Sequence, residues 1–409
     1  MRILHVIDSV NPVSGGPIEV VKQLARCITA DGANTVEIAS TDPPDAPYLK
    51  DVPVPVHACG AGLLSHGGRG LRTYAHSPRL RSWLRANHQN YDCLVVNGLW
   101  TYVSRLTRLV LRNSDVPYVV VPHGMLDPWS THTDTLKYLK KRVYWFLNEQ
   151  KVLRDARAVV FTCEEERLLA RHSFRSYSIS ECVIVNGTAR PPGNEVLQNS
   201  AFFDRYPDLR GKRLLTQIGR IHPKKGCDLA IEAFAKVLGG DPDWRLVIAG
   251  PDQVGLQKQL RSIAEKLNVS SRITWTGMLQ GDLKWGAIRA SEALLLPSHQ
   301  ENFGIVVVEA LACGVPVLIS NKVNIWREIE HDGSGIARND DLEGTCDLLR
   351  SWLSMTVEER AEMRRRAENC FTRRFEITRT AEILLALLKS IAKVPGAGNA
   401  PEVERYVRC

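Results

Sequence analysis

The chain has 409 residues, 44% of them hydrophobic and 24% charged, a composition ordinary for a globular protein of two or three domains. Its formal net charge of +8 favours anionic partners such as phosphates, nucleic acid or an acidic membrane surface. No apolar run is long enough to span a bilayer, which excludes all but peripheral contact with a membrane.

Short apolar runs rich in β-branched residues alternate with helical patterns through the first half of the chain. The run RILHVI at residues 2–7 is followed by a Gly-Gly loop and a helix with Pro17 in its first turn. Later runs are TVEIAS, DCLVVN, YVVVPHG and AVVFTC, and Ser77 is placed to cap a further helix. This alternation predicts βαβ units and a parallel sheet in a first domain at residues 1–190.

The segment NGTARPPGNEVLQNS interrupts this pattern with Pro, Gly and polar residues, and we expect a linker at residues 191–210. A second series of strands and helices predicts a second doubly wound domain at residues 211–370. Residues 394–409 lack an apolar period and are expected to form a flexible tail. The expected fold class is therefore α/β, with two Rossmann-like domains facing a central cleft.

Two glycine-rich loops are candidate ligand sites. Gly15 and Gly16 lie between the first strand and the first helix, where backbone N–H groups can approach an anion. A tight βα turn explains these glycines equally well. The segment CGAGLLSHGG has a partial dinucleotide pattern at Gly60 and Gly62, but no clean helix follows, and we expect no dinucleotide site there.

The motif GRIHPKKG, at residues 219–226, follows the first strand of the second domain. Arg220 leaves at the carboxyl end of that strand, and Lys225 follows a turn that contains proline. Two cations at the mouth of a cleft suit a diphosphate, because arginine binds two oxygens and lysine acts as a point charge. A solvated basic turn is the alternative.

The motif PSHQENFGIVVVEALACGVPV, at residues 297–317, follows an apolar strand in the second domain. We expect its helix to begin near Asn302 or Phe303. Gly304 has no side chain to block an oxygen atom, so the N–H groups of Phe303, Gly304 and Ile305 can point at a phosphate.

Two carboxylates, Glu301 and Glu309, belong to this motif. Glu309 lies one helical turn beyond Ile305 on the same face, and an ionised carboxylate can accept hydrogen bonds from two neighbouring hydroxyl groups of a sugar. Glu301, on the preceding loop, is free to contact another part of the same ligand. Because the helix has little polar surface, a merely solvated role for Glu309 is the weaker interpretation.

Three further features are less specific. His123 and Gly124 end a strand of the first domain and are expected to face the cleft. Asp241-x-Asp243 resembles a metal-binding pair but precedes a strand, so we expect a turn there, and no catalytic metal or other cofactor. Residues 135–157 are helical, basic and aromatic, and either pack into the first domain or lie on an acidic membrane with Tyr138, Tyr144, Trp145 and Phe146 at the interface.

The ten cysteines include no C-x-x-C pair and no Cys/His cluster with metal-ligand spacing. Most lie in apolar runs and are expected to be small buried side chains. The first ten residues are interrupted by Asp8 and do not resemble a signal peptide. We expect a cytoplasmic protein, with peripheral contact at the inner face of the membrane left open.

Taken together, the chain resembles the retaining glycosyltransferases of the GT4 family, which have a GT-B fold. The Gly-Gly loop, PHG, GRIHPKKG and the E-x7-E motif occur in the order typical of that family and span nearly the whole chain. The E-x7-E motif with EALACGVPV is specific, whereas the Gly-Gly loop is not.

The resemblance implies a nucleotide diphospho-sugar donor, a saccharide or lipid-linked acceptor, and no metal. It also implies a C-terminal helix at residues 371–393, with AEILLALLKSIA as its candidate, that crosses back to the first domain. The implied catalytic residues are His123, Arg220, Lys225 and Glu301. The implied donor-binding residues are Gly15, Gly16, Arg220, Lys225, Glu301, Asn302, Phe303, Gly304, Ile305 and Glu309. Acceptor-side loops are expected at residues 43–81 and 126–141, where members of the family differ.

Other classes of protein fit less well. A glycosidase also uses two carboxylates, but it has no need of the two cations at Arg220 and Lys225. A nicotinamide dehydrogenase should have a clean G-x-G-x-x-G motif, and a nucleic-acid-binding protein should have a basic stripe with stacking aromatic residues. A non-catalytic GT-B-like protein that binds nucleotide sugars is a further alternative, disfavoured because every expected donor-site residue is present.

Overall fold

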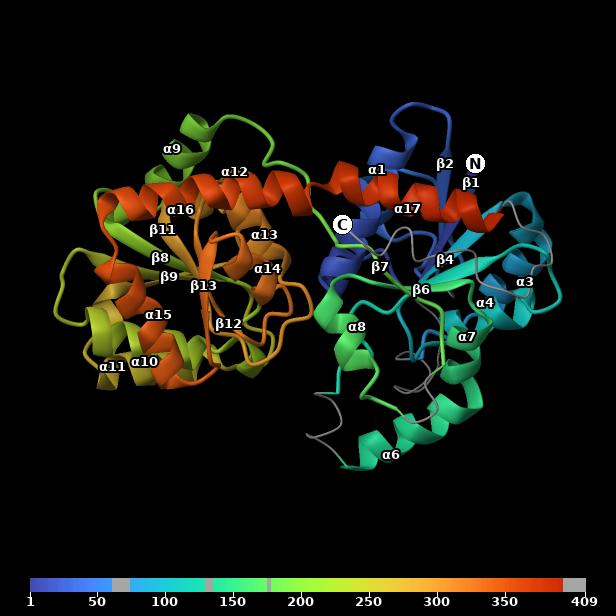
Figure 1. Cartoon of the computed structure of the whole chain (residues 1–409), viewed down its shortest axis with the longest axis horizontal. Coiled ribbons are helices and arrows are strands. Elements are labelled where there is room, and N and C mark those ends of the chain that lie inside the picture. Colours follow the sequence, from blue (N-terminus) through green and yellow to red (C-terminus); the bar gives the residue numbers. More distant parts are fainter. Residues whose placement is uncertain (61–73, 129–134, 175–177, 393–409) are drawn as a thin grey trace. The chain divides into compact units, whose positions relative to one another are not determined.

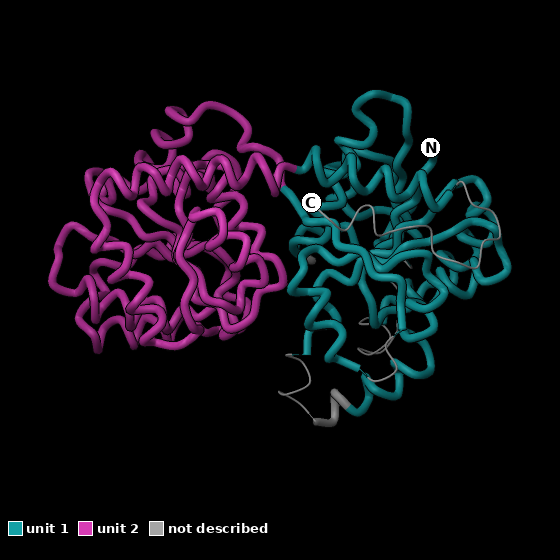
Figure 2. The backbone as a smooth tube through the Cα atoms, viewed as in Figure 1, with its two compact units in different colours: residues 1–187, 377–409 teal, residues 188–376 magenta. Residues whose placement is uncertain are grey.

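The computed structural model describes residues 1–60, 74–128, 135–174 and 178–392. The chain forms two compact units (Figures 1 and 2). Unit 1 comprises residues 1–187 together with the C-terminal segment from residue 377, and unit 2 comprises residues 188–376. The expected tail at residues 394–409 lies outside the described residues.

Unit 1 contains a parallel sheet of seven strands in the order β3-β2-β1-β4-β5-β6-β7. The strands are β1 (Arg2–Ile7), β2 (Thr35–Ser40), β3 (Val56–Ala58), β4 (Cys93–Asn97), β5 (Tyr118–Val121), β6 (Ala158–Phe161) and β7 (Glu181–Val183). The helices and helical turns are η1 (Pro12–Ser14), α1 (Gly16–Thr29), η2 (Pro47–Asp51), α3 (Pro78–Asn87), η3 (His88–Asn90), α4 (Tyr102–Leu111), α6 (Thr135–Tyr144), η4 (Trp145–Glu149), α7 (Gln150–Asp155), α8 (Glu164–Ala170) and α17 (Ile377–Ala392).

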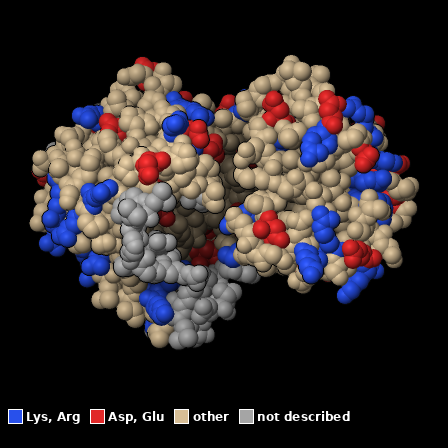
Figure 3. Space-filling model, turned by 180° about the vertical axis from the view of Figure 1, so that it is seen from behind, with Lys and Arg blue, Asp and Glu red and all other residues tan. Residues whose placement is uncertain are grey.

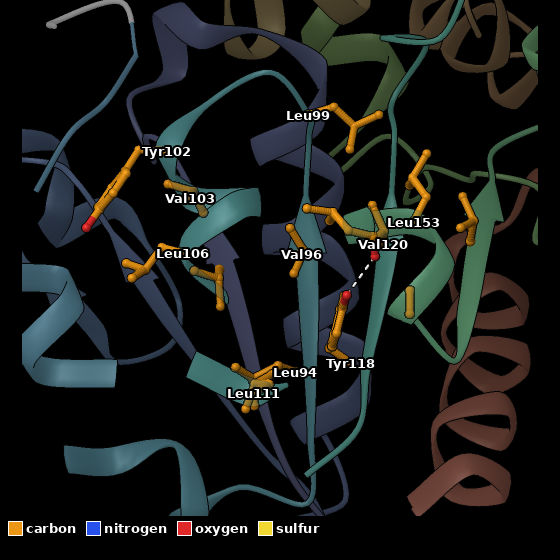
Figure 4. Close-up of a cluster of buried hydrophobic side chains, with 14 of the residues drawn as sticks. Leu94, Val96, Leu99, Tyr102, Val103, Leu106, Leu111, Tyr118, Val120 and Leu153 are labelled. Carbon is orange, nitrogen blue, oxygen red and sulfur yellow. Dashed lines mark hydrogen bonds between the residues drawn. The ribbon is translucent and has the colours of Figure 1, made fainter. Parts of the chain in front are cut away.

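Alternate residues of the central strands face opposite sides of this sheet, as the two-residue period of a strand requires. Leu94, Val96 and Val120 pack with α4 and α7 into one buried cluster (Figure 4). The hydroxyl of Tyr118 closes this cluster by donating to the carbonyl of Val152 at 2.6 Å. The polar end of this tyrosine is thereby satisfied without water.

The opposite face of the sheet is covered by α1 and by the C-terminal helix α17. Leu384 and Leu388 of α17 join Val95 and Val119 of the sheet in a second buried cluster. The helix begins at Ile377, later than the expected residue 371, because residues 371–375 continue α16 as a π-helical turn. A segment distant in sequence thus completes the core of unit 1.

Unit 2 contains a parallel sheet of six strands in the order β10-β9-β8-β11-β12-β13. The strands are β8 (Arg213–Ile218), β9 (Trp244–Ala249), β10 (Ile273–Gly277), β11 (Ser291–Leu296), β12 (Val317–Ser320) and β13 (Gly335–Arg338). The helices and helical turns are α9 (Glu195–Arg205), η5 (Pro207–Leu209), η6 (Pro223–Lys225), α10 (Cys227–Leu238), α11 (Gln257–Lys266), η7 (Ser270–Arg272), α12 (Gly281–Arg289), α13 (Ile305–Ala312), α14 (Trp326–His331), α15 (Leu342–Ser354), α16 (Val357–Cys370) and η8 (Phe371–Phe375). Both sheets confirm the predicted α/β class.

The linker predicted at residues 191–210 is wrong, because most of this segment is the helix α9. Asn194 caps the helix by accepting a hydrogen bond from the N–H of Val196 at 2.8 Å. Phe202 is fully buried, and α9 lies so close to α12 that a Cβ on Gly286 would be 2.1 Å from the carbonyl oxygen of Gln198. This packing makes α9 part of unit 2. The Pro- and Gly-rich sequence before the helix does not predict it.

Candidate active site

The sheet of unit 2 has a switch point between β8 and β11. The chain adds β9 and β10 on one side of β8 and then adds β11, β12 and β13 on the other side. Open parallel sheets bind ligands at such a point, beyond the carboxyl ends of the strands. The two motifs singled out in the sequence follow these two strands, GRIHPKKG after β8 and PSHQENFG after β11.

The loops after β8 and β11 are in direct contact. The N–H of His299 donates to the carbonyl of Lys224 at 2.8 Å. Gly226 has a φ of +60°, and a Cβ at this position would lie 2.1 Å from the carbonyl oxygen of Pro297. Only glycine fits both the conformation and the space, so this residue sets the close approach of the two loops.

Lys225 and Glu301 form an ion pair between these loops. Their side chains are 17% and 20% exposed. The backbone of Glu301 is fixed on both sides, because its N–H donates to Lys322 at 3.0 Å and its carbonyl accepts from Asn324 at 3.1 Å. Burial and the neighbouring charge of Arg220 lower the pKa of Lys225 to about 8, which leaves the ammonium form dominant at neutral pH.

The helix α13 begins at Ile305, so its predicted start at Asn302 or Phe303 is wrong. Gly304 has a φ of +74°, a left-handed conformation that a helix cannot include, and Asn302 and Phe303 precede it in a bend. The backbone N–H groups of Phe303, Gly304 and Ile305 donate to no residue that the structure describes. The partial positive charge of the helix start therefore remains available to an anion.

Glu309 is buried on α13, where its side chain is 11% exposed. The ammonium group of Lys284, on α12, lies 2.7 Å from its carboxylate. Sequence reasoning missed Lys284, because nothing in the segment GDLKW marks it and the contact depends on how two helices pack. An ammonium neighbour favours the charged carboxylate, which can only accept hydrogen bonds.

Arg220 extends from the carboxyl end of β8 and is exposed. Its guanidinium group donates to the side-chain oxygen of Gln253 at 3.4 Å, and it forms no ion pair with any described residue. Gly219 and Gly250 let the loop leave the sheet here, since a Cβ on Gly250 would lie 1.8 Å from the carbonyl of Gly219. The positive charge of Arg220 is thus not neutralised by a described acid.

Gly15 and Gly16 lie in unit 1 at the start of α1. Gly15 has a φ of +95° and its N–H donates to Pro12 at 3.1 Å, so the residue does close a turn. Both glycines are exposed, and apart from their chain neighbours no atom of a described residue lies within 4 Å of the place where a Cβ would stand on either one. The backbone at the helix start is therefore accessible.

His123 is held in a strained turn at the end of β5, also in unit 1. Its φ is +51° and that of Gly124 is +77°. The carboxylate of Glu166 accepts hydrogen bonds from the N–H of Gly124 and, at 2.7 Å, from the N–H of Thr162. Nε2 of His123 lies 3.1 Å from Oδ1 of Asn97. Asn97 and Glu166 had no signal in the sequence beyond their places near strand ends.

The Asp241-x-Asp243 segment is a turn, as expected. Oδ1 of Asp241 accepts a hydrogen bond from the N–H of Asp243 at 2.9 Å, and Asp243 pairs with Lys212. No group of three or more His, Cys, Asp or Glu side chains that could hold a metal ion occurs among the described residues.

The basic aromatic segment is helical but only partly in the expected arrangement. Trp145 is buried and stacks on Phe174 with ring centroids 4.7 Å apart, so its expected place at a membrane interface is wrong. The hydroxyl of Tyr144 lies 2.8 Å from that of Tyr74. The side chain of Tyr138 lies outside the described part. Four apolar side chains of this segment are exposed: Leu139, Val143, Phe146 and Leu147.

The charged residues show no segregation on the face of the molecule in Figure 3, where described Lys and Arg side chains are interspersed with Asp and Glu on each unit. Among the helices that the structure describes, none combines the length and apolar character needed to cross a membrane.

Two family models match the chain in sequence order. Residues 15–187 match the model described as "Glycosyl transferase 4-like domain", and residues 201–369 match the model described as "Glycosyl transferases group 1". A curated relative, the GDP-mannose:cellobiosyl-diphosphopolyprenol alpha-mannosyltransferase of Xanthomonas campestris, is 23% identical over 92% of this chain and 93% of its own.

Solved structures share the fold over nearly the whole chain. Alr3699/HepE of Anabaena, in complex with UDP and glucose, has a TM-score of 0.75 at 18% identity and covers 95% of this chain and 100% of its own. WaaG, a glycosyltransferase involved in lipopolysaccharide biosynthesis, has a TM-score of 0.68 at 17% identity, with 97% and 100% covered. The chain therefore belongs to the GT4-like glycosyltransferases and has their GT-B fold.

Proposed function

We propose that the enzyme transfers a sugar from a nucleotide diphospho-sugar to a hydroxyl group of a saccharide or lipid-linked saccharide, with retention of configuration and without a metal ion. One observation carries this proposal: the loops at the switch point of unit 2 bring Arg220, Lys225 and the start of α13 to one edge of the sheet. The UDP and glucose bound by Alr3699/HepE support the class of donor.

The diphosphate binds to this positive edge. Arg220 is not paired with a described acid, Lys225 is protonated at neutral pH, and the N–H groups of Phe303, Gly304 and Ile305 lack described acceptors. Breaking the glycosyl–phosphate bond builds negative charge on the leaving group. Fixed cations and N–H dipoles at that place lower the barrier, and they supply the charge that a metal ion supplies in other transferases.

The two carboxylates hold the other parts of the donor. Glu309 accepts hydrogen bonds from the ribose hydroxyls, and its pair with Lys284 holds its carboxylate in place for that purpose. Glu301 and the backbone of Asn302 contact the transferred sugar, with Glu301 oriented by Lys225. Since each carboxylate already has an ammonium partner, neither is suited to be the protonated acid that a glycosidase requires.

For the residues of unit 1, the resemblance to the family assigns His123 to the sugar and the accessible backbone of Gly15 and Gly16 to the phosphates. The acceptor oxygen attacks the anomeric carbon from the side that the diphosphate leaves, and its proton passes to the departing phosphate oxygen. This front-face reaction retains the configuration and needs no protein nucleophile.

The acceptor is proposed to be linked to a lipid at an acidic membrane surface. The relative from Xanthomonas campestris acts, by its name, on a diphosphopolyprenol-linked saccharide. Leu139, Val143, Phe146 and Leu147 form an exposed apolar surface on α6 and η4, 45–61% exposed, with exposed basic residues beside them. Such a surface lies in the interface of a bilayer and brings the enzyme to a lipid-linked substrate.

A thermal-shift screen against a panel of nucleotide sugars tests the donor. A donor present at 100 times its dissociation constant should stabilise the folded chain by about 2.7 kcal/mol. The matching free sugars serve as controls and should give no shift. Stabilisation by none of the nucleotide sugars would contradict the proposal, and NMR of the product anomer then tests retention with the donor identified.

A further inference from the structure

An amide group lies between two imidazoles at the carboxyl end of β4. Nδ2 of Asn97 is 3.1 Å from the carbonyl oxygen of Val95 and 3.2 Å from Nδ1 of His5. Oδ1 of Asn97 is 3.1 Å from Nε2 of His123. These contacts form one chain of hydrogen bonds from β1 through β4 to the turn after β5.

The carbonyl of Val95 fixes the direction of every hydrogen bond in this chain. A peptide oxygen can only accept, so the amide turns its Nδ2 group toward Val95 and its Oδ1 toward His123. Because Oδ1 also only accepts, Nε2 of His123 carries a proton. Because the second Nδ2 proton points at Nδ1 of His5, that atom carries none, and neutral His5 holds its proton on Nε2.

The inner part of this chain of hydrogen bonds is protected from water by its place in the fold, whereas His123, at its outer end, is partly exposed. His5 and Asn97 are 1% and 6% exposed, on the face of the sheet that α1 and α17 cover. Together with His123 they line a cavity of about 20 Å³, to which α17 contributes Thr380. The hydroxyl of Thr380 donates to the carbonyl of Val185 at 2.8 Å, so its proton is directed away from the imidazoles.

Both imidazoles are neutral in this environment. Burial lowers the pKa of His5 and of His123 to about 4, and at His5 the neighbouring imidazole adds to the effect. The carboxylate of Glu166, which holds this turn, accepts hydrogen bonds from the N–H of Gly124 and from the N–H and hydroxyl of Thr162. A neutral imidazole with a proton on Nε2 has an acceptor lone pair on Nδ1.

We propose that Asn97 is a positioning residue for His123, which it holds as the Nε2–H tautomer so that Nδ1 accepts a hydrogen bond from a hydroxyl of the transferred sugar. No described residue donates to that Nδ1 atom. His5 acts one step further back, by holding the amide of Asn97. The contact with sugar rests on the proposed function, whereas the proton positions rest on the hydrogen bonds alone.

Selective labelling of the eleven histidines of the full chain with ¹⁵N tests the proton positions by NMR. Long-range ¹H–¹⁵N spectra distinguish the two tautomers, and single His→Gln variants assign His5 and His123. We expect Nε2–H at both residues and neutral rings down to about pH 5. Asn97→Asp replaces the donor with an acceptor, so His5 should move its proton to Nδ1, and the pKa of His123 should rise to about 5–7.

Two further variants separate positioning from folding. Asn97→Leu keeps the volume but removes the amide, and should lower kcat/KM for the donor about tenfold without changing the affinity for UDP alone. Thr380→Val, in the same cavity, should change neither tautomer nor rate. A proton on Nδ1 of His123 in the unaltered chain would overturn the proposal. So would a proton that stays on Nε2 of His5 in the Asn97→Asp variant. The spectra need no substrate, so they decide the proton positions even if no nucleotide sugar binds.

Discussion

The ammonium group of Lys284 lies 2.7 Å from the carboxylate of Glu309 and joins α12 to α13. The two side chains are 24% and 11% exposed, so both charges are largely withdrawn from water. Every residue of α13 from Val306 to Ala312 is buried. A helix this apolar tolerates a carboxylate because a neighbouring helix supplies the opposite charge.

Lys284→Met should therefore destabilise the enzyme, because it removes the ammonium partner of a buried carboxylate. We expect the free energy of unfolding at pH 7 to fall by about 1–3 kcal/mol, measured by urea denaturation followed by tryptophan fluorescence. Lys236→Met is the matched control, because its pair with Glu343 is half exposed and should contribute less than about 0.5 kcal/mol. Equal losses in the two variants would show that burial of the pair is unimportant.

The same pair marks the limit of what the sequence predicts. The strand and helix series, and the placement of Arg220 and Glu301 after strands, follow from local apolar periods and loop motifs. Lys284, Asn97 and Glu166 contact their partners only because elements distant in sequence pack together. The local apolar periodicity of the sequence does not predict such contacts.

Errors in the predicted boundaries have equally physical causes. Pro191, Pro192 and Gly193 predict a linker at the segment that forms α9, whereas burial of Phe202 decides its structure. The predicted start of α13 is too early because the sequence does not show that Gly304 adopts the left-handed conformation that ends the bend before the helix.

Arg220→Ala should reduce turnover by about 10²–10³-fold, the scale for losing one group that stabilises a developing charge. The fold should be unaffected, because the side chain is exposed and its one hydrogen bond to a described side chain, that of Gln253, is long. Steady-state kinetics with the identified donor measure the loss. Arg210→Ala, which removes another exposed arginine of unit 2, should leave turnover within twofold, and near-normal transfer by Arg220→Ala would remove this residue from the site.

Binding of a nucleotide diphosphate should weaken at alkaline pH. The pKa of Lys225 in the folded chain is about 8, below the usual 10.5, so the ammonium form is present below pH 8 and is lost above it. In the enzyme without ligand, the same lowered pKa means that the contribution of Lys225 to the free energy of unfolding increases between pH 8 and pH 10.5, because the folded state favours the neutral amine. The affinity for UDP changes in the opposite direction and falls as the pH rises, because the diphosphate attracts only the charged form of Lys225.

Titration calorimetry between pH 7 and pH 9.5 measures this effect. Above pH 8 the affinity for UDP should fall by up to about tenfold for each further pH unit. Lys225→Arg keeps its charge over this range and should give an affinity that is almost independent of pH. A pH dependence shared by both proteins would assign the titration to another group.

The exposed apolar surface on α6 and η4 should bind acidic membranes. Leu139, Val143, Phe146 and Leu147 recur at intervals of three and four residues, which places them on one side of the helix. Lys140 and Arg142 are exposed beside them and are attracted to anionic lipids. We expect the enzyme to sediment with vesicles that contain acidic lipid and to be released by salt.

Changing these four apolar residues to Ser should reduce the vesicle-bound fraction at least about tenfold, because the buried apolar area supplies part of the binding energy. The matched control is the pair Val196→Ser and Leu197→Ser on α9, which are 73% and 66% exposed but have no such basic neighbours on their helix. Catalysis with a soluble acceptor should be unchanged in both variants. If the two variants bind vesicles equally well, the apolar surface of α6 and η4 does not contact the membrane. The enzyme then binds acidic vesicles only through its net positive charge.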